Sequence, residues 1–363
     1  MGVKIAINGL GVLGRKILRM FLENGSFEST IGSPNDIQLV CVNDQYPLST
    51  AKYLLQHDTV YGKINNYRIT SSGEYPKEEL EFNGDTLSYF CYGVDIPWGD
   101  VGAEVVIDCT GTTSLSRLQQ HLNMGAQYVI ACEGGSSWVD SSVGRFVWGI
   151  NTGFYTSEHK ISVCPSGDAI ASAVLAKYLN DSYTIQNGIF ENIVSYTNLN
   201  NLQDSNLSKT EPQVGRAGAW NIIPRFSNVS RTLHRIVPIL NGKTKSFEHR
   251  CGTIAGSHTD LIASLSKEFN QADFADVLKQ IANDSNSLGD VFKKQIPYLN
   301  YSDWNTFETS SDVIGDQGMT YNINNVSLID PTFVRVGLSY DSIALQAANA
   351  ILMALYAGKD FTV

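Results

Sequence analysis

Apolar and polar residues at the start of the chain follow a strand–turn–helix pattern. Residues 3–8 form the apolar run of a short buried strand. Gly9, Gly11 and Gly14 follow in the string GxGxxG, and apolar side chains then recur on one helical face as far as Gly25. This order predicts a strand, a tight turn and a helix that ends at Gly25. It is the context in which GxGxxG indicates a dinucleotide site, with an ordinary glycine-rich strand-to-helix turn as the alternative.

Each glycine of this string has its own role in a dinucleotide site. Gly9 permits the turn, Gly11 lets the backbone approach a pyrophosphate, and Gly14 lets the helix lie against the strand. The N–H groups and the dipole at the start of the helix then attract the phosphates.

Strand and helix patterns alternate through the rest of the first half. The predicted strands cover 37–43, 105–109 and 128–132, the helices cover 48–55 and 115–124, and an antiparallel ribbon covers 67–94. This alternation is typical of an α/β fold with a parallel, doubly wound sheet. The second half reads differently: a helix within 162–179, strands at 187–196 and around Arg250, a helix at 272–282 and strands within 321–338.

Asp44 closes the predicted strand 37–43. An acidic residue at this place holds the adenosine ribose hydroxyls and repels a 2′-phosphate, which favours NAD over NADP. The distance from Gly14 exceeds the usual ~20 residues, because residues 26–35 have the character of an inserted loop. The alternative role for Asp44 is a surface cap.

Length and charge narrow the classes of function. A chain of 363 residues is long enough for two domains with cores of their own. The net charge of −10 argues against a nucleic-acid-binding or anionic-membrane-binding surface, since both need a basic field. No apolar run approaches the roughly 18 residues of a membrane helix, and the apolar start is broken by the glycine turn, unlike a signal peptide.

The six cysteines are scattered and lack the paired spacing of a zinc site, so no metal is expected. Several lie in apolar, strand-like runs. Reduced, buried thiols in a cytoplasmic protein are therefore the expectation.

Several longer strings, spread over nearly the whole chain, point to one known family. They are INGLGVLGR from Ile7, VND from Val42, IPWGDVGAEVVIDCTG from Ile96, HLNMGAQYVI from His121, FVWGIN from Phe146, NIIP from Asn221 and VPILNGK from Val237. In these strings the chain resembles the glyceraldehyde-3-phosphate dehydrogenases.

The resemblance implies a subunit of two domains. Residues 1–165 would form a Rossmann domain that binds NAD, with the C-terminal helix within 342–363 packed on it. Residues 166–341 would form an α+β domain with an antiparallel sheet, which carries catalysis and oligomerisation in the family. Family members are usually homotetramers whose loop before NIIP, here 206–220, reaches across the interface. A homo-oligomer, dimer or tetramer, is therefore expected.

The catalytic positions of the family are altered. Its nucleophilic cysteine stands at the start of a helix and falls on Gly167 counted back from the shared Leu-Ala-Lys, or on Ser166 counted from the front of the loop. Neither residue is a thiol. Cys164 lies just upstream and is a weak substitute, since a reactive cysteine needs an electropositive setting. The family's histidine base corresponds to Thr197, which cannot accept a proton near neutral pH.

The positions that bind phosphate in the family are altered as well. Asp168 replaces a threonine and would repel a phosphate, with a helix N-cap as its favoured role and a catalytic base as the weaker one. Ser227 stands where the family has threonine, and Arg231 where it often has lysine. Arg250 matches the family's substrate-phosphate arginine, although a surface salt bridge is an equal alternative for it.

The cofactor positions are better preserved. The resemblance assigns cofactor binding to Asn8, Gly9, Gly11, Leu13, Gly14, Asp44, Thr110, Gly111 and Ser342. Ser342 replaces the asparagine that anchors the nicotinamide, and Val12 replaces an arginine. The sequence therefore predicts a well-held adenylate half and a loosely held nicotinamide.

Two classes of function remain open. The first is an NAD-binding family member without phosphorylating aldehyde dehydrogenase activity, acting as a scaffold, sensor or regulator. The second is an NAD-dependent oxidoreductase with non-covalent chemistry on another carbonyl compound, using Asp168, His249 or His258 to move the proton.

Overall fold

The protein is described from a computed structural model that covers residues 2–23, 37–64, 69–134, 143–198, 200–205, 212–270, 273, 277, 313–314, 319–322 and 327–359. Its contacts divide the chain into two compact units. The first unit comprises Met1–Ser166 with Gln346–Val363, and the second comprises Gly167–Leu345. The predicted helix end at Gly25 and the predicted loop 26–35 lie outside the described residues. The predicted helix 272–282 also lies outside them, apart from residues 273 and 277.

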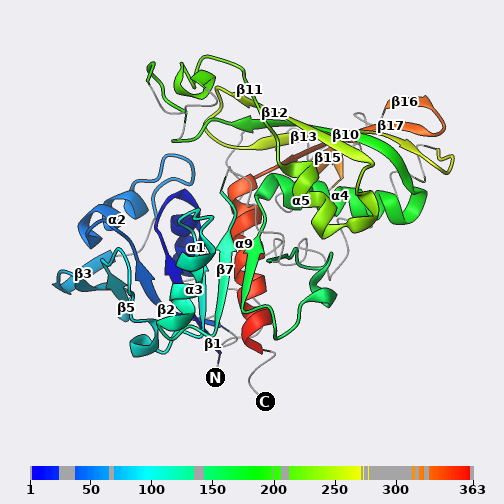
Figure 1. The fold of residues 1–363 in the computed structure, drawn as a ribbon. Coiled ribbons are helices and arrows are strands. Elements are labelled where there is room, and N and C mark those ends of the chain that lie inside the picture. Colours follow the sequence, from blue (N-terminus) through cyan, green and yellow to red (C-terminus); the bar gives the residue numbers. More distant parts are fainter. Residues whose placement is uncertain are drawn as a thin grey trace. The chain divides into compact units, whose positions relative to one another are not determined.

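The first unit is built on a nine-stranded sheet with the order β3-β4-β5-β2-β1-β6-β7-β9-β8 (Figure 1). The strands are β1 Val3–Asn8, β2 Ile37–Asn43, β3 Ile69–Glu74, β4 Lys77–Phe82, β5 Asp85–Phe90, β6 Val105–Asp108, β7 Tyr128–Cys132, β8 Gly144–Arg145 and β9 Ile161–Cys164. From β5 to β8 neighbouring strands run parallel, which confirms the doubly wound sheet. The ribbon β3-β4-β5 is antiparallel within itself, and β5 joins it to β2 by a parallel pairing.

The helices of the first unit are α1 Val12–Glu23, α2 Leu48–Gln56, α3 Leu115–Asn123 and the 3-10 turns η1 Trp98–Val101 and η2 Thr152–Phe154. The C-terminal helix α9, Ser342–Lys359, belongs to this unit from Gln346 onward. Asn349 ties it to the loop after β8, because its Nδ2 donates to Phe146 O (3.1 Å) and its Oδ1 accepts from Trp148 N (2.8 Å).

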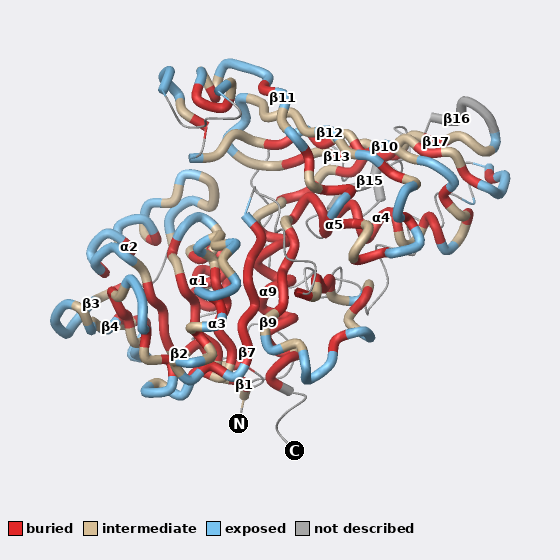
Figure 2. The backbone as a smooth tube through the Cα atoms, viewed as in Figure 1, coloured by how far each residue is buried: buried red, intermediate tan, exposed pale blue. Residues whose placement is uncertain are grey.

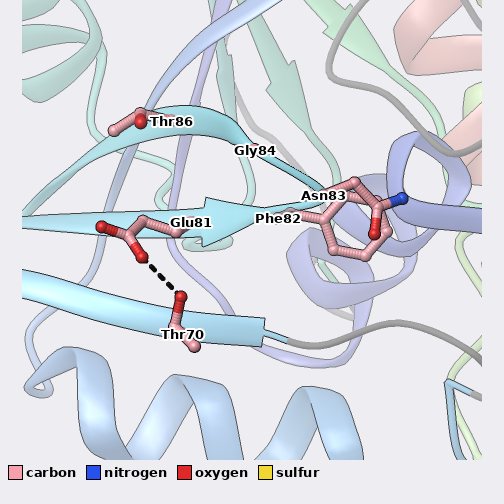
Figure 3. A pocket seen from close by; sticks show the side chains of 6 residues that line it. All are labelled: Thr70, Glu81, Phe82, Asn83, Gly84 and Thr86. Atoms are coloured by element: carbon pink, nitrogen blue, oxygen red, sulfur yellow. Dashed lines mark hydrogen bonds between the residues drawn. The ribbon is translucent and has the colours of Figure 1, made fainter.

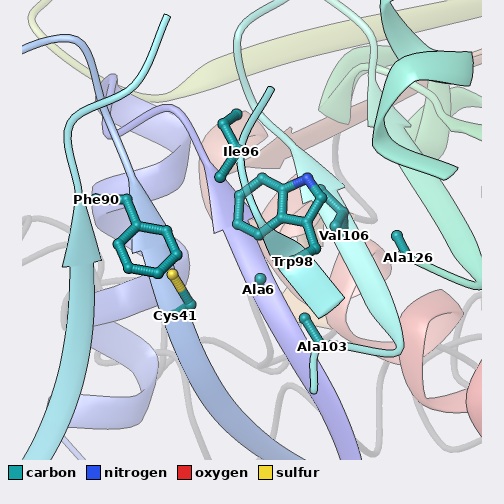
Figure 4. Packing of buried hydrophobic residues seen from close by; sticks show 8 residues of the cluster. All are labelled: Ala6, Cys41, Phe90, Ile96, Trp98, Ala103, Val106 and Ala126. Atoms are coloured by element: carbon teal, nitrogen blue, oxygen red, sulfur yellow. The ribbon is translucent and has the colours of Figure 1, made fainter. Parts of the chain in front are cut away.

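The apolar core explains why the strands of the first unit are nearly continuous apolar runs. A parallel sheet covered on both faces has no solvent side, so β6 and β7 are buried throughout and β1 is buried at every position except the half-buried Lys4 (Figure 2). On one face the fully buried Trp98 lies among small and aliphatic side chains (Figure 4). The cluster consists of Ala6, Cys41, Phe90, Ile96, Trp98, Ala103, Val106 and Ala126.

The second unit has an eight-stranded sheet with the order β11-β12-β10-β13-β17-β15-β14, and β16 pairs with β17. The strands are β10 Ile185–Ser195, β11 Ile223–Arg225, β12 Thr244–Cys251, β13 Ser257–Leu265, β14 Val313–Ile314, β15 Met319–Asn322, β16 Ser327–Asp330 and β17 Phe333–Tyr340. The pairings of this sheet are antiparallel as predicted, except that β10 and β12 are parallel, so the sheet is mixed. The helix α5, Val229–Ile236, lies between β11 and β12 along the chain, and the crossover it provides allows this parallel pairing.

The two faces of this sheet differ. The helices α4, Gly167–Tyr183, and α5, Val229–Ile236, pack against one face, which we call the inner face (Figure 1). The 3-10 turns η3 Pro212–Gly215 and η4 Pro238–Leu240 flank α5. Because side chains alternate along a strand, every second residue of β10, β12, β13 and β17 points to the inner face and the others to the outer face.

Candidate functional site

The glycine turn between β1 and α1 has little room for side chains. Gly9 adopts a φ of +92°, and its N–H donates to Asn43 O (2.7 Å). A Cβ at Gly14 would lie 1.9 Å from Gly9 O, so the helix passes directly over the turn. A Cβ at Gly11 would meet nothing within 4 Å. The turn is thus closed at Gly9 and Gly14 and open at Gly11, as a pyrophosphate site requires.

Asp44 lies where β2 ends and contacts this turn. Its Oδ2 accepts the N–H of Leu10 and its Oδ1 accepts the N–H of Tyr46 (3.0 Å). Each carboxylate oxygen retains a further lone pair, so the half-buried Asp44 can also accept ribose hydroxyls. Arg15 supports the same turn by donating from Nη1 to Leu10 O (2.9 Å), and burial lowers its pKa against the opposing effect of Asp58 and Asp44.

A buried polar network lies behind the turn, at the carboxyl ends of β1, β2 and β6. Asn8 Nδ2 donates to Asp108 Oδ2 (2.8 Å), and Asn43 Nδ2 donates to Asn8 Oδ1 (2.9 Å). Trp98 Nε1 donates to His121 Nδ1 (2.9 Å), which leaves the Nε2 hydrogen of His121 for Asp108 Oδ2 (2.9 Å). The network locks the strand ends that carry the turn.

Asp108 is the centre of this network. Its Oδ1 accepts both the N–H (3.0 Å) and the hydroxyl (2.6 Å) of Thr110. Burial by itself raises the pKa of Asp108, but the hydrogen bonds from His121, Thr110 and Asn8 outweigh it, so the pKa is lowered. The loop after β6 is held in this way, with Gly111 at a φ of +71°.

These residues fit a dinucleotide. The open space at Gly11, the first N–H groups of α1 and the carboxylate of Asp44 supply the contacts for pyrophosphate and ribose. Leu13 is half-buried and Thr110 is exposed beside the turn. The side chain of Asn8, in contrast, is 7 % exposed and is used by the network, so it positions the turn.

The start of α4 in the second unit is closed. A Cβ at Gly167, the first residue of this helix, would lie 1.9 Å from the carbonyl oxygen of Ser342. Asp168 follows in the first helical turn and is 9 % exposed. Because α4 already begins at Gly167, Asp168 lies inside the helix and not at the predicted N-cap position, and its Oδ1 accepts a hydrogen bond from the hydroxyl of Tyr340 (2.9 Å).

The hydroxyl of Tyr340 continues a polar row across the inner face. It lies 2.7 Å from Thr259 Oγ1, which donates to Asn192 Oδ1 (2.8 Å). Burial, together with the charges of Asp168 and Glu248, raises the pKa of Tyr340 well above its ordinary value. At neutral pH this hydroxyl therefore keeps its hydrogen.

Arg250 is occupied by protein partners on the same face. Its Nε is 2.9 Å from Glu248 Oε1, both side chains are 12 % exposed, and Nη1 donates to Ser195 O (2.9 Å). Burial raises the pKa of Glu248, an effect that Arg250 opposes and Asp168 strengthens. Asp168 and Glu248 thus bring two carboxyl groups to the neighbourhood of the one arginine that matches a substrate-phosphate residue.

Two models of one enzyme family match the chain. The glyceraldehyde 3-phosphate dehydrogenase NAD binding domain matches residues 3–115, and the C-terminal domain of the same enzyme matches residues 167–330. The relative "Glyceraldehyde-3-phosphate dehydrogenase 1" from Mucor circinelloides f. lusitanicus is 30% identical over 347 residues, which cover 94% of each chain. The chain belongs to the glyceraldehyde-3-phosphate dehydrogenase family. Its first unit is the family's NAD-binding domain, and the predicted cofactor is NAD.

Other relatives carry the same name. "Glyceraldehyde-3-phosphate dehydrogenase" from Streptomyces coelicolor is 27% identical over 320 residues, covering 87% of this chain and 86% of its own. "Glyceraldehyde-3-phosphate dehydrogenase 3, cytosolic" from Zea mays is 31% identical over 270 residues, covering 73% and 74%.

The residues predicted to stand at the family's cysteine position offer no reactive thiol. Gly167 has no space for a side chain, and Ser166, half-buried, directly precedes α4. Cys164 is fully buried at the end of β9, where its Sγ accepts from Asn349 Nδ2 (3.3 Å). Burial raises the pKa of Cys164 well above its ordinary value, opposite to what a nucleophile needs.

The other predicted residues of this site have local roles. Thr197 donates from its backbone N–H to Asn200 Oδ1 (3.1 Å) in the turn after β10. Ser227 Oγ accepts from Val229 N (3.4 Å) at the start of α5, and the exposed Arg231 lies 5.7 Å from the Phe226 ring centroid.

The sequence offers Asp168, His249 or His258 as a proton carrier, and the structure divides these alternatives between the two faces of the second sheet. Both histidines alternate to the outer face, whereas Asp168 contacts Tyr340 on the inner face. His249 Nδ1 is 3.4 Å from Glu191 Oε1, and His258 Nδ1 is 2.8 Å from Ser339 Oγ.

Sequence reasoning missed Glu248 and Tyr340. Glu248 stands two residues before Arg250 in one strand, and this period-two spacing places both on one face. Tyr340 stands two residues before Ser342, but only the packing of β17 against α4 brings it to Asp168.

A separate surface hollow of about 560 Å³ lies on the antiparallel ribbon of the first unit (Figure 3). Thr70, Glu81, Phe82, Asn83, Gly84 and Thr86 line it, and Thr70 Oγ1 donates to Glu81 Oε2 (2.5 Å). None of the predicted site residues contributes to it. Among the described residues, no group of three or more His, Cys, Asp or Glu side chains is arranged to hold a metal ion, and no helix is long and apolar enough to cross a membrane.

Proposed function

We propose that this chain is an NAD-binding member of the glyceraldehyde-3-phosphate dehydrogenase family that lacks phosphorylating aldehyde dehydrogenase activity and acts as a scaffold, sensor or regulator. The observation that carries this proposal is the closed backbone at Gly167, where a side chain would lie 1.9 Å from Ser342 O. The main chain of Ser342 fills the space that a side chain at Gly167 would need, so a cysteine would not fit at this position.

The loss of the covalent step follows from this packing. Acyl transfer through a thioester requires an accessible thiolate with a base in hydrogen-bond reach. Cys164 is fully buried, and Thr197 supplies no proton acceptor. Losing a positioned base alone removes roughly 10²–10⁴-fold of the rate.

Electrostatics disfavours the phosphorylated substrate as well. The carboxyl groups of Asp168 and Glu248 lie on the face that holds Arg250, and Glu248 occupies its guanidinium. A phosphate that approached this arginine would have to displace the carboxylate or lie beside it. In a partly buried site two like charges repel by several kcal/mol (about 4 at 4 Å).

The test separates cofactor binding from turnover. NAD binding is followed by fluorescence quenching, and NADH formation is followed with glyceraldehyde 3-phosphate, NAD and inorganic phosphate. We expect saturable binding without NADH formation above the background rate. Turnover that Cys164→Ser abolishes would contradict the proposal. Cys251→Ser serves as the matched control because Cys251 is a half-buried thiol at the end of β12.

Tyr340 supports a second candidate, an NAD-dependent oxidoreductase with non-covalent chemistry. Its hydroxyl, hydrogen-bonded to Asp168, is a proton-bearing pair on the inner face. A screen of unphosphorylated carbonyl compounds with NADH tests this candidate. Turnover that is lost in Asp168→Asn and in Tyr340→Phe would replace the first proposal with the second.

The outer face of the second sheet is proposed as the surface of a homo-oligomer, dimer or tetramer. Ile189 (43 % exposed), Ile193 (40 %) and Phe247 (54 %) are exposed apolar side chains on neighbouring strands of this face, around the half-exposed Glu191. A self-complementary sheet face suits a two-fold interface. Phe247→Asp is expected to shift the sedimentation coefficient toward the monomer, whereas Val94→Asp, an exposed apolar position of the first unit, is not.

A cytoplasmic location is proposed on the thiols. All six cysteines are free, and four of them are buried. Free thiols persist where the compartment keeps them reduced.

A further inference from the structure

Three cysteines lie side by side at the carboxyl edge of the first unit's sheet. Cys132 ends β7 and Cys164 ends β9, and the two are register partners in the parallel pairing of these strands. Cys109 directly follows Asp108, whose register partner is Ala131, so it is in line with Cys132. The Sγ atoms of Cys109 and Cys132 are 3.9 Å apart. Three neighbouring strands thus form one row of thiols.

The members of this row differ in their access to solvent. Cys109 is half-buried, Cys132 is 4 % exposed and Cys164 is fully buried. The Cys164 thiol is also held by Asn349 Nδ2 (3.3 Å) and Gln346 O (3.5 Å). An oxidant that arrives from solvent therefore meets Cys109 first, and the nearest second thiol is that of Cys132.

We propose that Cys109 and Cys132 form a reversible disulfide in response to a hydroperoxide and that this bond weakens NAD binding. In the first step the Cys109 thiolate attacks a peroxide oxygen, the O–O bond breaks, and Cys109 becomes a sulfenic acid while water (from hydrogen peroxide) leaves. In the second step the Cys132 thiolate attacks the Cys109 sulfur, and a second water leaves. Two thiols and one hydrogen peroxide thus give one disulfide and two waters.

The strand geometry permits this bond. Neighbouring strands lie about 4.8 Å apart, within the ~4.4–6.8 Å between Cα atoms that a disulfide spans. The sulfur atoms must close from 3.9 Å to about 2.05 Å. The pKa of the Cys132 thiol is raised well above its ordinary value by the hydrogen bond with Cys109 and by burial. The hydrogen bond with Cys164 lowers this pKa but does not outweigh the other two effects. The second step is therefore expected to accelerate as the pH rises.

The disulfide would act through Thr110 on the glycine turn between β1 and α1, which we call the cofactor turn. This residue follows Cys109 directly, and a Cβ at Gly9 would lie only 3.1 Å from its Cγ2. β6 lies between β1 and β7 in the sheet, so drawing Cys109 toward Cys132 moves Thr110 and Gly111 away from the glycine turn and disturbs their packing on it. By reciprocity, bound NAD would slow formation of the disulfide.

The experiment uses the full chain with hydrogen peroxide, followed by thiol blocking and peptide mapping without reductant. We expect one cross-linked peptide pair that joins Cys109 to Cys132, with two of the six thiols lost and restored by dithiothreitol. NAD affinity should fall by about tenfold on oxidation, within the usual range of coupling between sites. Cys109→Ser should abolish both effects, and Cys251→Ser should abolish neither.

Two results would overturn the proposal. The first is a peptide map in which Cys109 is oxidised without a bond to Cys132. This measurement uses the wild-type chain and needs no substitution of the buried Cys132. The second is the expected bond with unchanged NAD affinity. Neither readout uses glyceraldehyde 3-phosphate, so the outcome is independent of whether the chain oxidises that aldehyde.

Discussion

The cofactor turn of the first unit and the start of α4 in the second unit each contain a glycine with no room for a side chain. A Cβ at Gly14 would lie 1.9 Å from Gly9 O, and a Cβ at Gly167 would lie 1.9 Å from Ser342 O. At Gly14 the close approach builds a dinucleotide turn, because backbone N–H groups do the binding. At Gly167, one of the two positions proposed to match the family's nucleophile, the same close approach fills the space that a side chain would need. Close packing of this kind is compatible with binding by backbone N–H groups but leaves no room for a reactive side chain.

Substitution of Gly14 tests whether the close approach at the cofactor turn is needed for NAD binding. Gly14→Ala places a methyl group against a main-chain carbonyl and should destabilise the fold by about 3 kcal/mol, with loss of NAD binding. Gly11→Ala is the matched control, since its methyl group meets nothing within 4 Å. We expect the control to keep its unfolding free energy within ~0.5 kcal/mol while it binds NAD more weakly. Urea unfolding and fluorescence quenching measure the two quantities.

Gly167→Cys addresses the close approach at the start of α4. The new side chain cannot be accommodated without a shift of Ser342, so we expect a loss of stability of about 2–3 kcal/mol and no gain of NADH formation. Gly153→Ala, with nothing within 4 Å of its new methyl group, is the control for a glycine replacement. A stable Gly167→Cys protein with rapid iodoacetamide labelling would show that the site is not closed.

Asp108→Asn tests how far the cofactor turn depends on the network behind it. An amide nitrogen cannot accept the bonds from Thr110 or His121, so the folded protein should lose about 3 kcal/mol at neutral pH. The folded-state pKa of Asp108 is depressed, so its contribution is present above the unfolded value of about 3.9 and is lost as the pH falls through the folded pKa. The deficit of the variant should therefore shrink below about pH 4. The exposed Asp100→Asn should show no such deficit.

Asp168→Ala measures the polar row on the inner face. The buried hydroxyl of Tyr340 loses its acceptor, which should cost about 1–3 kcal/mol. Asp168→Asn retains an oxygen that accepts the same hydrogen bond and should be close to wild type in thermal unfolding. Equal losses in both variants would mean that the negative charge, and not the hydrogen bond, stabilises this place.

Glu248→Gln should have the smallest effect. It should chiefly change the slope of the free energy of unfolding plotted against pH. Burial raises the folded-state pKa of Glu248 against the opposing effect of Arg250. Such a group makes the protein less stable as the pH rises from its unfolded value, about 4.3, through the folded pKa. The variant has no proton to lose, so its stability should decline less across this window. Parallel stability curves for variant and wild type would contradict the assignment.

Local patterns were sufficient for most of the first unit. The strand 37–43 and the strand 128–132 have the predicted bounds, because continuous apolar runs between turn residues leave few alternatives. The parallel pairing of β10 with β12 was not predicted, since it joins residues far apart in the chain through a crossover that no local pattern encodes. The same limit applied to His249 and His258, whose face of the sheet depends on register.

The sequence by itself determined the family and the dinucleotide turn, because these are properties of residue identity and spacing. The tertiary structure alone decided that Gly167 is closed by Ser342, that Tyr340 holds Asp168, and that Cys109 and Cys132 are neighbours. Each of these contacts joins separate elements. Contacts of that kind are fixed by the packing of the folded chain, which local sequence patterns do not specify.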